Sequence, residues 1–334
     1  MIRFAILGYG FVGAIHAATL KKVKNAELVA IVEKDQSKWK TVTTGNINVE
    51  GMEPLDVPCY ESIDDLLKQH EIDAISICLP THLHREYTEI AMQAGLHVVC
   101  EKPMALTLQD CDAMIDAAER YDRQLFVAQC IRFWPEYEIL KDMHDKRELG
   151  DPISFRFHRL SGMPAWAGAG SWFLDENKSG GCLFDLHVHD VDFAQLLLGK
   201  PRRVFSQGVR LPQGANAAVL SQFDFGDNLM CTIEGSWLYS SGFKMTFSAV
   251  YENGQLEYDS GAVPTMKLYR KDNPQPELVP VPDGDGYVNE YNYFVECLEN
   301  GKAPERILPS SARFSIQLAL AEQASIRSKG IVVL

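Results

Sequence analysis

Residues 2–13 read IRFAILGYGFVG, an apolar run from Ile2 to Leu7 followed by the turn Gly8-Tyr9-Gly10-Phe11-Val12-Gly13. The apolar run predicts a buried strand, and the stretch Val12–Leu20 predicts a helix. Between such elements the first glycine permits a tight turn, the second lets the backbone approach a pyrophosphate, and the third allows close packing of helix on strand. This stretch therefore predicts a dinucleotide-binding fold.

An acidic residue follows at the distance that such a fold uses. Glu33 lies 20 residues after Gly13, at the end of a second apolar stretch, Leu28–Val32. A carboxylate there accepts hydrogen bonds from ribose hydroxyls and repels a 2′-phosphate. Lys34 and Lys38 weaken that repulsion, but we still expect the cofactor to be NAD rather than NADP.

The rest of the first 124 residues alternates strand-like and helix-like stretches, which is typical of a doubly wound parallel sheet. The further strands expected are Ala74–Leu79 and His97–Cys100, and the further helices are Ser62–Gln69, His84–Ala94 and Leu108–Tyr121. We therefore predict an α/β fold with a Rossmann domain at residues 1–124.

From residue 125 the pattern changes to longer alternating stretches separated by turn residues, which favours an antiparallel sheet. The expected strands are Ile153–Leu160, Arg203–Val209, Ala217–Phe225, Leu229–Leu238 and Lys244–Tyr251, and the expected helices are Asp190–Leu198, Val288–Leu298 and Ser310–Arg327. Residues 125–334 are thus predicted to form an α+β domain.

Composition narrows the class of protein further. The formal net charge of −13 argues against nucleic acid or an anionic membrane as partner. No apolar stretch reaches the roughly 20 residues that a transmembrane helix needs. The eight cysteines are scattered singly, which favours reduced thiols and a cytoplasmic location.

A lysine follows the His97–Cys100 strand in the sequence Glu101-Lys102-Pro103. Ligands of doubly wound sheets bind at the carboxyl ends of strands, and a following proline restricts Lys102 to extended conformations. A fixed ammonium beside a nicotinamide would stabilise the alkoxide that develops as hydride leaves. The alternative is a solvated lysine at a strand-end turn.

The segment Gly180–Asp190 holds the other group of candidate residues. If it begins a helix, Asp185 and His189 fall at positions i and i+4 on one face. An imidazole suits proton transfer to and from an alcohol, and the carboxylate could orient substrate or ring. The alternative is that these histidines only satisfy a packed helix start. We predict no metal site, because His187 and His189 lie two residues apart and do not face each other on a helix.

Three motifs together resemble the Gfo/Idh/MocA family, which is named after glucose-fructose oxidoreductase and inositol dehydrogenase. They are Gly8-x-Gly10-x-x-Gly13, Gly95–Pro103, and Gly180-Gly181 followed by Asp185-x-x-x-His189. The resemblance implies a Rossmann domain followed by an open-faced sheet that often forms a dimer interface. It also implies that Lys102, Asp185 and His189 are the catalytic set, with His189 as acid and base and a cis bond between Lys102 and Pro103.

The resemblance also implies a set of contacts to the cofactor. Beside the glycines and Glu33, these contacts fall on Tyr9, Phe11, Val12, Leu79, Thr81, His84, Glu101, Lys102 and Gln129. Trp172 and Tyr287 resemble positions where some members touch cofactor or substrate, although large rings at domain seams are often packing. Many relatives carry glycine where His187 stands, so a second imidazole could enter the pocket, support an oligomer contact or do neither.

By position, Arg132 and Trp166 look like substrate-binding residues, together with Asp185 and His189. The predicted function is hydride transfer between NAD and a hydroxyl-bearing carbon of a sugar, sugar acid or cyclitol, in a homodimer or homotetramer. Two alternatives are a regulator that senses a dinucleotide or sugar without turnover, and a glycosidase that recycles its NAD.

Overall fold

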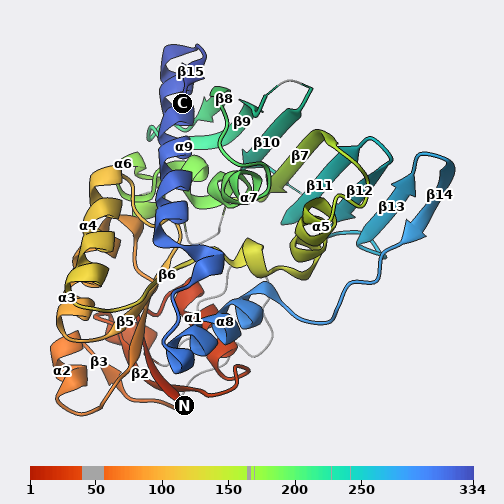
Figure 1. Ribbon diagram of the computed structural model, residues 1–334. Helices are drawn as coiled ribbons and strands as arrows, with labels where there is room; N and C mark the ends of the chain where they lie inside the picture. Colours follow the sequence, from red (N-terminus) through yellow and green to blue (C-terminus); the bar gives the residue numbers. More distant parts are fainter. Residues whose placement is uncertain (40–55, 164–166, 169, 227, 241) are drawn as a thin grey trace. The chain divides into compact units, whose positions relative to one another are not determined.

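A computed structural model describes residues 1–39, 56–163, 167–168, 170–226, 228–240 and 242–334 (Figure 1). The contacts between residues divide the chain into two compact units. Unit 1 comprises Met1–Cys130 and Gly286–Arg313, and unit 2 comprises Ile131–Asp285 and Phe314–Leu334. Trp166, one of the predicted substrate residues, lies outside the described residues.

Unit 1 is built on a six-stranded sheet with the strand order β3-β2-β1-β4-β5-β6, and every pairing in it is parallel. Its strands are β1 (Ile2–Leu7), β2 (Ala26–Val32), β3 (Cys59–Tyr60), β4 (Ala74–Ile77), β5 (His97–Glu101) and β6 (Leu125–Ala128). Its helices are α1 (Phe11–Leu20), α2 (Ile63–Leu67), α3 (His84–Gln93), α4 (Leu108–Arg120) and α8 (Gly286–Asn300). The predicted doubly wound sheet is confirmed.

Local sequence accounts for these elements. Residues 4–7 of β1 and all of β4 are buried, as expected of strands covered by helices on both faces. Ser62 and Thr107 are N-caps whose side chains accept hydrogen bonds from the backbone N–H groups of Asp65 and Asp110, so α2 and α4 begin where unpaired donors are satisfied. Figure 1 shows α3 and α4 on one face of the sheet, and α1 beside α8 on the other.

Unit 2 is built on a nine-stranded sheet with the order β14-β13-β12-β11-β7-β10-β9-β8-β15, antiparallel except where β10 pairs with β7. Its strands are β7 (Pro152–Leu160), β8 (Arg203–Arg210), β9 (Asn216–Asp224), β10 (Met230–Ser236), β11 (Lys244–Tyr251), β12 (Gly254–Asp259), β13 (Met266–Arg270), β14 (Asn273–Leu278) and β15 (Val332–Val333). Its helices are α5 (Pro135–Asp145), α6 (Glu176–Ser179), α7 (Val188–Leu198) and the part of α9 (Pro309–Ser328) from Phe314.

The two faces of this sheet differ. In β11 the side chains of Met245, Phe247, Ala249 and Tyr251 are buried, while those between them are half-buried. Tyr137 of α5 packs edge-on against Phe247 and against Phe193 of α7, so these helices cover the buried face. The antiparallel sheet predicted from the alternation is confirmed, with one parallel pairing.

Two features of the chain were not predicted. Helix α5 begins with Pro135 at its first position, three residues after Arg132, which was predicted to bind substrate. Helix α8 contacts α1 and β1, so Gly286–Arg313 packs with unit 1, whereas the predicted domains were 1–124 and 125–334. That domain boundary stays a prediction. Among the described residues, every helix is too short or too polar to span a lipid bilayer.

Candidate cofactor and active site

Most of the predicted cofactor residues lie at one edge of the unit 1 sheet. The glycine turn follows β1, Glu33 follows β2, Leu79 and Thr81 follow β4, Lys102 follows β5, and Gln129 follows β6. Because all six strands are parallel, these residues share the carboxyl edge. The strand order reverses between β1 and β4, which is where open α/β sheets bind ligands.

The three glycines of the turn meet different surroundings. Gly8 has a φ of +93°, and a Cβ there would lie 2.7 Å from the carbonyl oxygen of Cys78. A Cβ on Gly13 would lie 2.1 Å from the carbonyl oxygen of Gly8, whereas a Cβ on Gly10 would meet nothing within 4 Å. Gly8 and Gly13 are therefore required by the fold. The open space beside Gly10 would let a pyrophosphate approach the protein backbone closely.

This difference gives a prediction for two matched alanine variants. Gly13→Ala should lower the free energy of unfolding by about 1–3 kcal/mol, because the new methyl group is forced against a backbone oxygen. Gly10→Ala should change stability by less than about 1 kcal/mol but weaken NAD binding about tenfold, which is about 1.4 kcal/mol. Urea denaturation and NAD titration measure the two quantities. NAD binding that is unchanged in Gly10→Ala would contradict the assigned pyrophosphate contact.

Glu33 connects the second strand to the glycine turn. Its Oε2 atom accepts a hydrogen bond from the Tyr9 backbone N–H at 2.9 Å, and its Oε1 atom accepts one from the Asp35 backbone N–H at 2.9 Å. The carboxylate is thus held beside the turn, where a ribose of a bound dinucleotide would lie. Tyr9 itself is 2% exposed, so its side chain belongs to the core.

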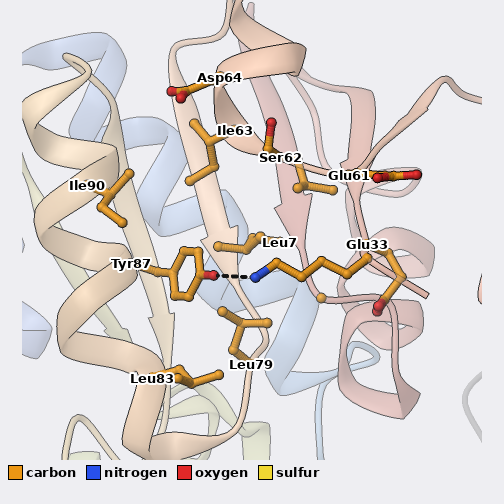
Figure 2. A pocket seen from close by; sticks show the side chains of 13 residues that line it. Leu7, Glu33, Glu61, Ser62, Ile63, Asp64, Leu79, Leu83, Tyr87 and Ile90 are labelled. Atoms are coloured by element: carbon orange, nitrogen blue, oxygen red, sulfur yellow. Dashed lines mark hydrogen bonds between the residues drawn. The ribbon is translucent and has the colours of Figure 1, made fainter. Parts of the chain in front are cut away.

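A cavity of about 270 Å³ opens beside Glu33 (Figure 2). Its lining includes Gly8, Ser62, Leu79 and Tyr87. Lys34 Nζ donates a hydrogen bond to Tyr87 OH at 3.1 Å, and Lys38 Nζ lies 3.7 Å from Glu33 Oε2. The two lysines that could soften repulsion of a 2′-phosphate are therefore already engaged with protein groups.

Lys102 is held through its neighbours on both sides. Its backbone N–H donates to Glu101 Oε2 at 3.0 Å, and its bond to Pro103 is cis, as the family resemblance implied. The His84 ring contacts the carbonyl oxygen of Pro103 through Nδ1 and that of Leu79 through Nε2, both at 2.9 Å. His84 is 1% exposed, and burial lowers the pKa of its imidazole. It joins the loops after β4 and β5 and leaves no ring nitrogen for a cofactor.

Gln129 presents buried polar atoms at the same edge of the sheet. Its side chain is 1% exposed, and within the described part of the chain neither Nε2 nor Oε1 has a hydrogen-bond partner. Buried amides almost always find partners, so each exception calls for a ligand, a water or another explanation. The donor and acceptor of Gln129 match those of a carboxamide such as that of nicotinamide.

In unit 2, Asp185 and His189 lie on consecutive helical segments. Leu183–His187 forms a π-helical turn, labelled η5, and α7 continues from Val188. The predicted ordinary helix start is thus replaced by a wider turn, which still keeps residues four apart on roughly the same side. Such turns occur frequently at functional sites. Asp185 is half-buried and His189 is 9% exposed.

His187 points into the core of unit 2. Its Nε2 atom contacts Glu322 Oε1 of α9 at 2.7 Å, and both side chains are fully buried. A Cβ on Gly235 of β10 would lie 2.7 Å from the His187 Cβ, so a glycine there makes room for the imidazole. Three roles were left open for His187: a pocket residue, an oligomer contact, or neither. The buried pairing with Glu322 supports the last.

Two buried ion pairs hold α7 from its inner side. Arg132 donates to both carboxylate oxygens of Asp192 at 2.7 and 2.6 Å, and Ser315 Oγ donates to Asp192 Oδ1 at 2.7 Å. Arg159 donates to both oxygens of Asp190 at 2.8 and 2.9 Å. Arg132 is 4% exposed and is engaged by a buried carboxylate, so its predicted substrate contact stays a prediction that this geometry does not favour.

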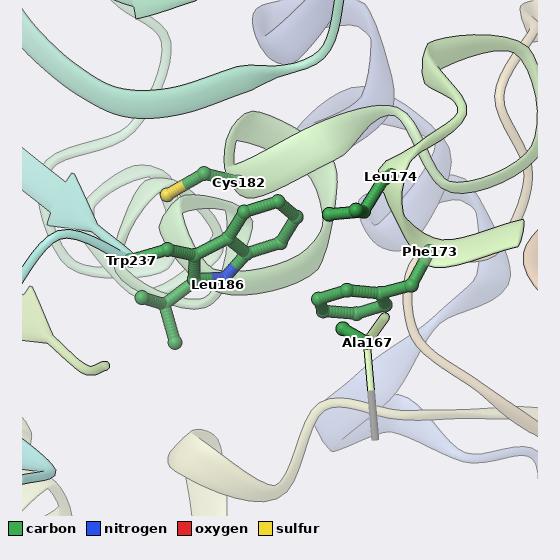
Figure 3. Packing of buried hydrophobic residues seen from close by; sticks show 6 residues of the cluster. All are labelled: Ala167, Phe173, Leu174, Cys182, Leu186 and Trp237. Atoms are coloured by element: carbon green, nitrogen blue, oxygen red, sulfur yellow. The ribbon is translucent and has the colours of Figure 1, made fainter. Parts of the chain in front are cut away.

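A buried hydrophobic cluster that includes Phe173 and Trp237 packs against the π-helical turn through Leu186 (Figure 3). Phe173 stacks on Trp237 with ring centroids 4.5 Å apart, and Cys182 and Leu186 complete the same buried cluster. Trp172 is half-buried and packs against this cluster, which supports the packing role left open for it. Tyr287, the other aromatic predicted at the site, is half-buried at the start of α8 in unit 1.

Sequence reasoning missed a buried network of hydrogen-bonded side chains in unit 1. His16 of α1, Ser76 of β4 and Tyr291 of α8 form hydrogen bonds that reach Glu101. The one visible signal was His16, three residues after Gly13 in a mostly apolar helix. Tyr87, which lines the cavity beside Glu33, was also missed.

Comparisons with known proteins agree with this arrangement. Residues 2–129 match the model of an oxidoreductase family with an NAD-binding Rossmann fold, and residues 137–257 match the C-terminal domain of the same GFO/IDH/MocA family. The chain is 25% identical to myo-inositol 2-dehydrogenase of Thermotoga maritima, over all of this chain and 98% of that one.

Two further similarities concern an uncharacterised relative and the fold. An uncharacterised oxidoreductase of Streptococcus pneumoniae is 29% identical, over 60% of this chain and 51% of the relative. The crystal structure of the WlbA dehydrogenase of Bordetella pertussis, in complex with NADH and UDP-GlcNAcA, superposes with a TM-score of 0.85. It is 22% identical and covers 100% of this chain and 97% of that one, which shows a shared fold.

Proposed function

The chain belongs to the Gfo/Idh/MocA family of NAD-binding oxidoreductases, and from that premise we propose that it transfers hydride reversibly between NAD and a hydroxyl-bearing carbon of a sugar, sugar acid or cyclitol. The observation that carries the proposal is the carboxyl edge of the unit 1 sheet, where the glycine turn, Glu33 and Lys102 follow β1, β2 and β5. The name of the Thermotoga relative, a cyclitol dehydrogenase, supports the substrate class.

The described residues fit a bound dinucleotide. The glycine turn would hold the pyrophosphate beside Gly10, Glu33 would accept hydrogen bonds from the adenosine ribose, and Gln129 would pair with the nicotinamide carboxamide. The Glu33 carboxylate, with Lys34 and Lys38 already engaged, supports NAD over NADP. When bound, NAD supplies the hydride acceptor.

The chain's own residues would manage the proton and the charge on oxygen. His189 would take the proton from the substrate hydroxyl during oxidation and return it during reduction. The Lys102 ammonium would stabilise the negative charge that develops on that oxygen, and Asp185 would orient substrate or the imidazole. This division of roles needs one ionisable base and one fixed cation. Helix α7 of unit 2 supplies the base, and the loop after β5 of unit 1 supplies the cation.

A spectrophotometric screen tests the function. Purified protein is incubated with NAD and a panel of sugars, sugar acids and cyclitols, and separately with NADH and the matching ketones, while nicotinamide absorbance is followed. We expect net NADH formation with at least one polyol, and tighter binding of NAD than of NADP. Dinucleotide binding without turnover would favour the sensing regulator, and glycoside cleavage without net NADH would favour the NAD-recycling glycosidase.

We also propose that two or four copies associate through the open face of the unit 2 sheet, in a reducing cytosol that suits eight free thiols. Val209, Leu220 and Met230 lie on that face and are 55%, 49% and 55% exposed, which is unusual for large apolar side chains gathered on one sheet.

A charge on this face tests the association. Leu220→Glu should shift the protein to monomer in light scattering, because a buried unpaired carboxylate opposes association. Val263→Glu is the matched control, since Val263 is 100% exposed and lies off the sheet. A wild-type protein that is monomeric at all concentrations would contradict the proposed interface.

A further inference from the structure

Four buried side chains in unit 1 form one continuous line of hydrogen bonds that ends beside Lys102. Ser76 Oγ contacts Tyr291 OH at 2.5 Å, Tyr291 OH contacts His16 Nδ1 at 2.6 Å, and His16 Nε2 contacts Glu101 Oε1 at 2.8 Å. The other oxygen of Glu101 accepts the Lys102 backbone N–H at 3.0 Å. Each link joins a different pair of elements, from β4 through α8 and α1 to β5.

The line lies inside the protein. Ser76, His16 and Tyr291 are 0% exposed, and Glu101 is 8% exposed. The His16 and Tyr291 rings meet edge to face with centroids 5.3 Å apart, so packing as well as hydrogen bonding fixes their orientation. A polar network at this depth is costly unless every member is satisfied, and a fully satisfied network specifies one arrangement.

Donors and acceptors can be assigned along the whole line. An ionised Glu101 accepts only, so its Oε2 accepts a hydrogen bond from the Lys102 N–H and its Oε1 accepts one from His16 Nε2–H. With the ring proton on Nε2, His16 Nδ1 accepts a hydrogen bond from the Tyr291 hydroxyl, whose oxygen accepts in turn from Ser76. Glu101 thus selects the His16 tautomer, and Tyr291 holds the ring by its other nitrogen.

We propose that Ser76, Tyr291 and His16 are positioning residues that keep Glu101 ionised and oriented, and that through Glu101 they fix the backbone of Lys102. The assignment rests on the proposed function, because a fixed Lys102 backbone matters for activity only if Lys102 takes part in the reaction. It goes beyond that function in assigning a role to α8, whose Tyr291 is linked to Glu101 at the end of β5 through His16.

The charged surroundings of Glu101 agree with this role. Burial opposes its ionisation, but the hydrogen bond from His16 and the electrostatic interaction with the same ring, together with the charge of Lys102, offset burial and lower the pKa of the carboxyl group. Other titratable groups also face the network, and they are His84 from α3, Cys78 after β4, Cys100 in β5 and Glu290 in α8. The two thiols stay neutral, because burial raises the pKa of each well above its ordinary value.

The sign of the pH effect follows. The pKa of Glu101 is lowered in the folded protein, so its ionised form is present above the ordinary carboxyl range and is lost as pH falls through the lowered value. Removing the Tyr291 hydroxyl removes the hydrogen bond to His16 Nδ1 and leaves the ring less firmly oriented, which weakens its bond to Glu101. The acid limb of the kcat profile for ketone reduction, in which His189 acts as the acid and so sets the alkaline limb, should therefore move to higher pH by about one unit.

Tyr291→Phe tests the proposal, with Tyr293→Phe as the matched control on the same helix. Tyr293 OH accepts a hydrogen bond from the Arg306 backbone and lies off the network. We expect the acid limb to move in Tyr291→Phe and to stay in place in Tyr293→Phe, while NAD affinity changes less than about twofold in both. The shift of the acid limb caused by Tyr291→Phe should vanish when Glu101→Gln is also present, because a glutamine at that position does not titrate.

A second measurement does not depend on turnover. Nitrogen-15 NMR of the histidine rings in cofactor-free protein should show His16 as the Nε2–H tautomer in the wild type. The His16 Nδ1 resonance should move downfield in Tyr291→Phe, because that nitrogen loses the hydrogen bond from the Tyr291 hydroxyl. Ser76→Ala, which removes only the terminal donor, should give a smaller change of the same kind and serves if Tyr291→Phe fails to fold.

The outcomes separate the two proposals. An unchanged His16 Nδ1 resonance in both variants would overturn the network, whatever the enzyme does. The expected change of that resonance in a protein that reduces NAD with no polyol would leave the network standing as a structural device, and would overturn both its role at Lys102 and the proposed function. A kcat profile that shifts equally in Tyr293→Phe would assign the effect to general loss of packing.

Discussion

Replacing His189 with alanine is expected to lower kcat by a factor of about 10³, within the range of 10²–10⁴ that a positioned acid or base contributes. NAD affinity should change less than about twofold, because the predicted cofactor contacts of the glycine turn and Glu33 belong to unit 1 and His189 belongs to unit 2. Single-turnover reduction of NAD, with NAD binding measured separately by fluorescence, gives the two numbers.

The reason for a large effect lies in the surroundings of His189. The ring sits in the first turn of α7, directly after the π-helical turn that carries Asp185, and it is 9% exposed. Its neighbours in sequence on the inner side, Asp190 and Asp192, are paired with arginines. The helix is thus fixed by these two ion pairs.

Controls distinguish a lost base from a damaged fold. His144→Ala removes a half-buried imidazole of α5 that contacts Tyr251 OH, and it should leave kcat within about twofold. Added imidazole should restore part of the activity of His189→Ala and none to a variant that fails for structural reasons. A His189→Ala enzyme that keeps wild-type kcat would refute the assigned role, and an equal loss of NAD binding would place the residue in the cofactor site instead.

The sequence made the unit 1 site largely predictable. Gly8, Gly10, Gly13, Glu33 and Lys102 are local signals, because each lies at or shortly after the end of a short apolar strand and the spacing between strands is set by the helices that join them. The alternation of buried and half-buried residues along β11 was equally readable, since a half-covered sheet demands alternation.

The remaining features depend on partners that are distant in sequence. His187 pairs with Glu322, 135 residues later, and Tyr291 reaches His16, 275 residues earlier. Periodicity describes which face of one element is buried but not which side chain of another element meets it. The π-helical turn before α7 was also hidden, because it differs from an ordinary helix by one residue in the hydrogen-bond spacing and not by composition.

Arg132 provides the sharpest test of such a distant pairing. Arg132→Ala is expected to lower the free energy of unfolding by about 3–5 kcal/mol, because it leaves the Asp192 carboxylate buried without its arginine, and the Ser315 hydroxyl supplies no compensating charge. Urea denaturation, followed by circular dichroism, measures the loss. A substrate residue would behave differently, since its removal would raise KM and leave stability almost unchanged.

Two comparisons make the result decisive. Arg203→Ala breaks an ion pair with Asp224 in which Arg203 is 57% exposed, and exposed pairs contribute only about 0–1 kcal/mol. The double variant Arg132→Met with Asp192→Leu should recover much of the stability lost in Arg132→Ala, because replacing both partners of a buried pair by apolar side chains removes the unpaired charge. If Arg132→Ala unfolds like the wild type and instead raises KM, the arginine binds substrate, and its contact with Asp192 must open during the reaction.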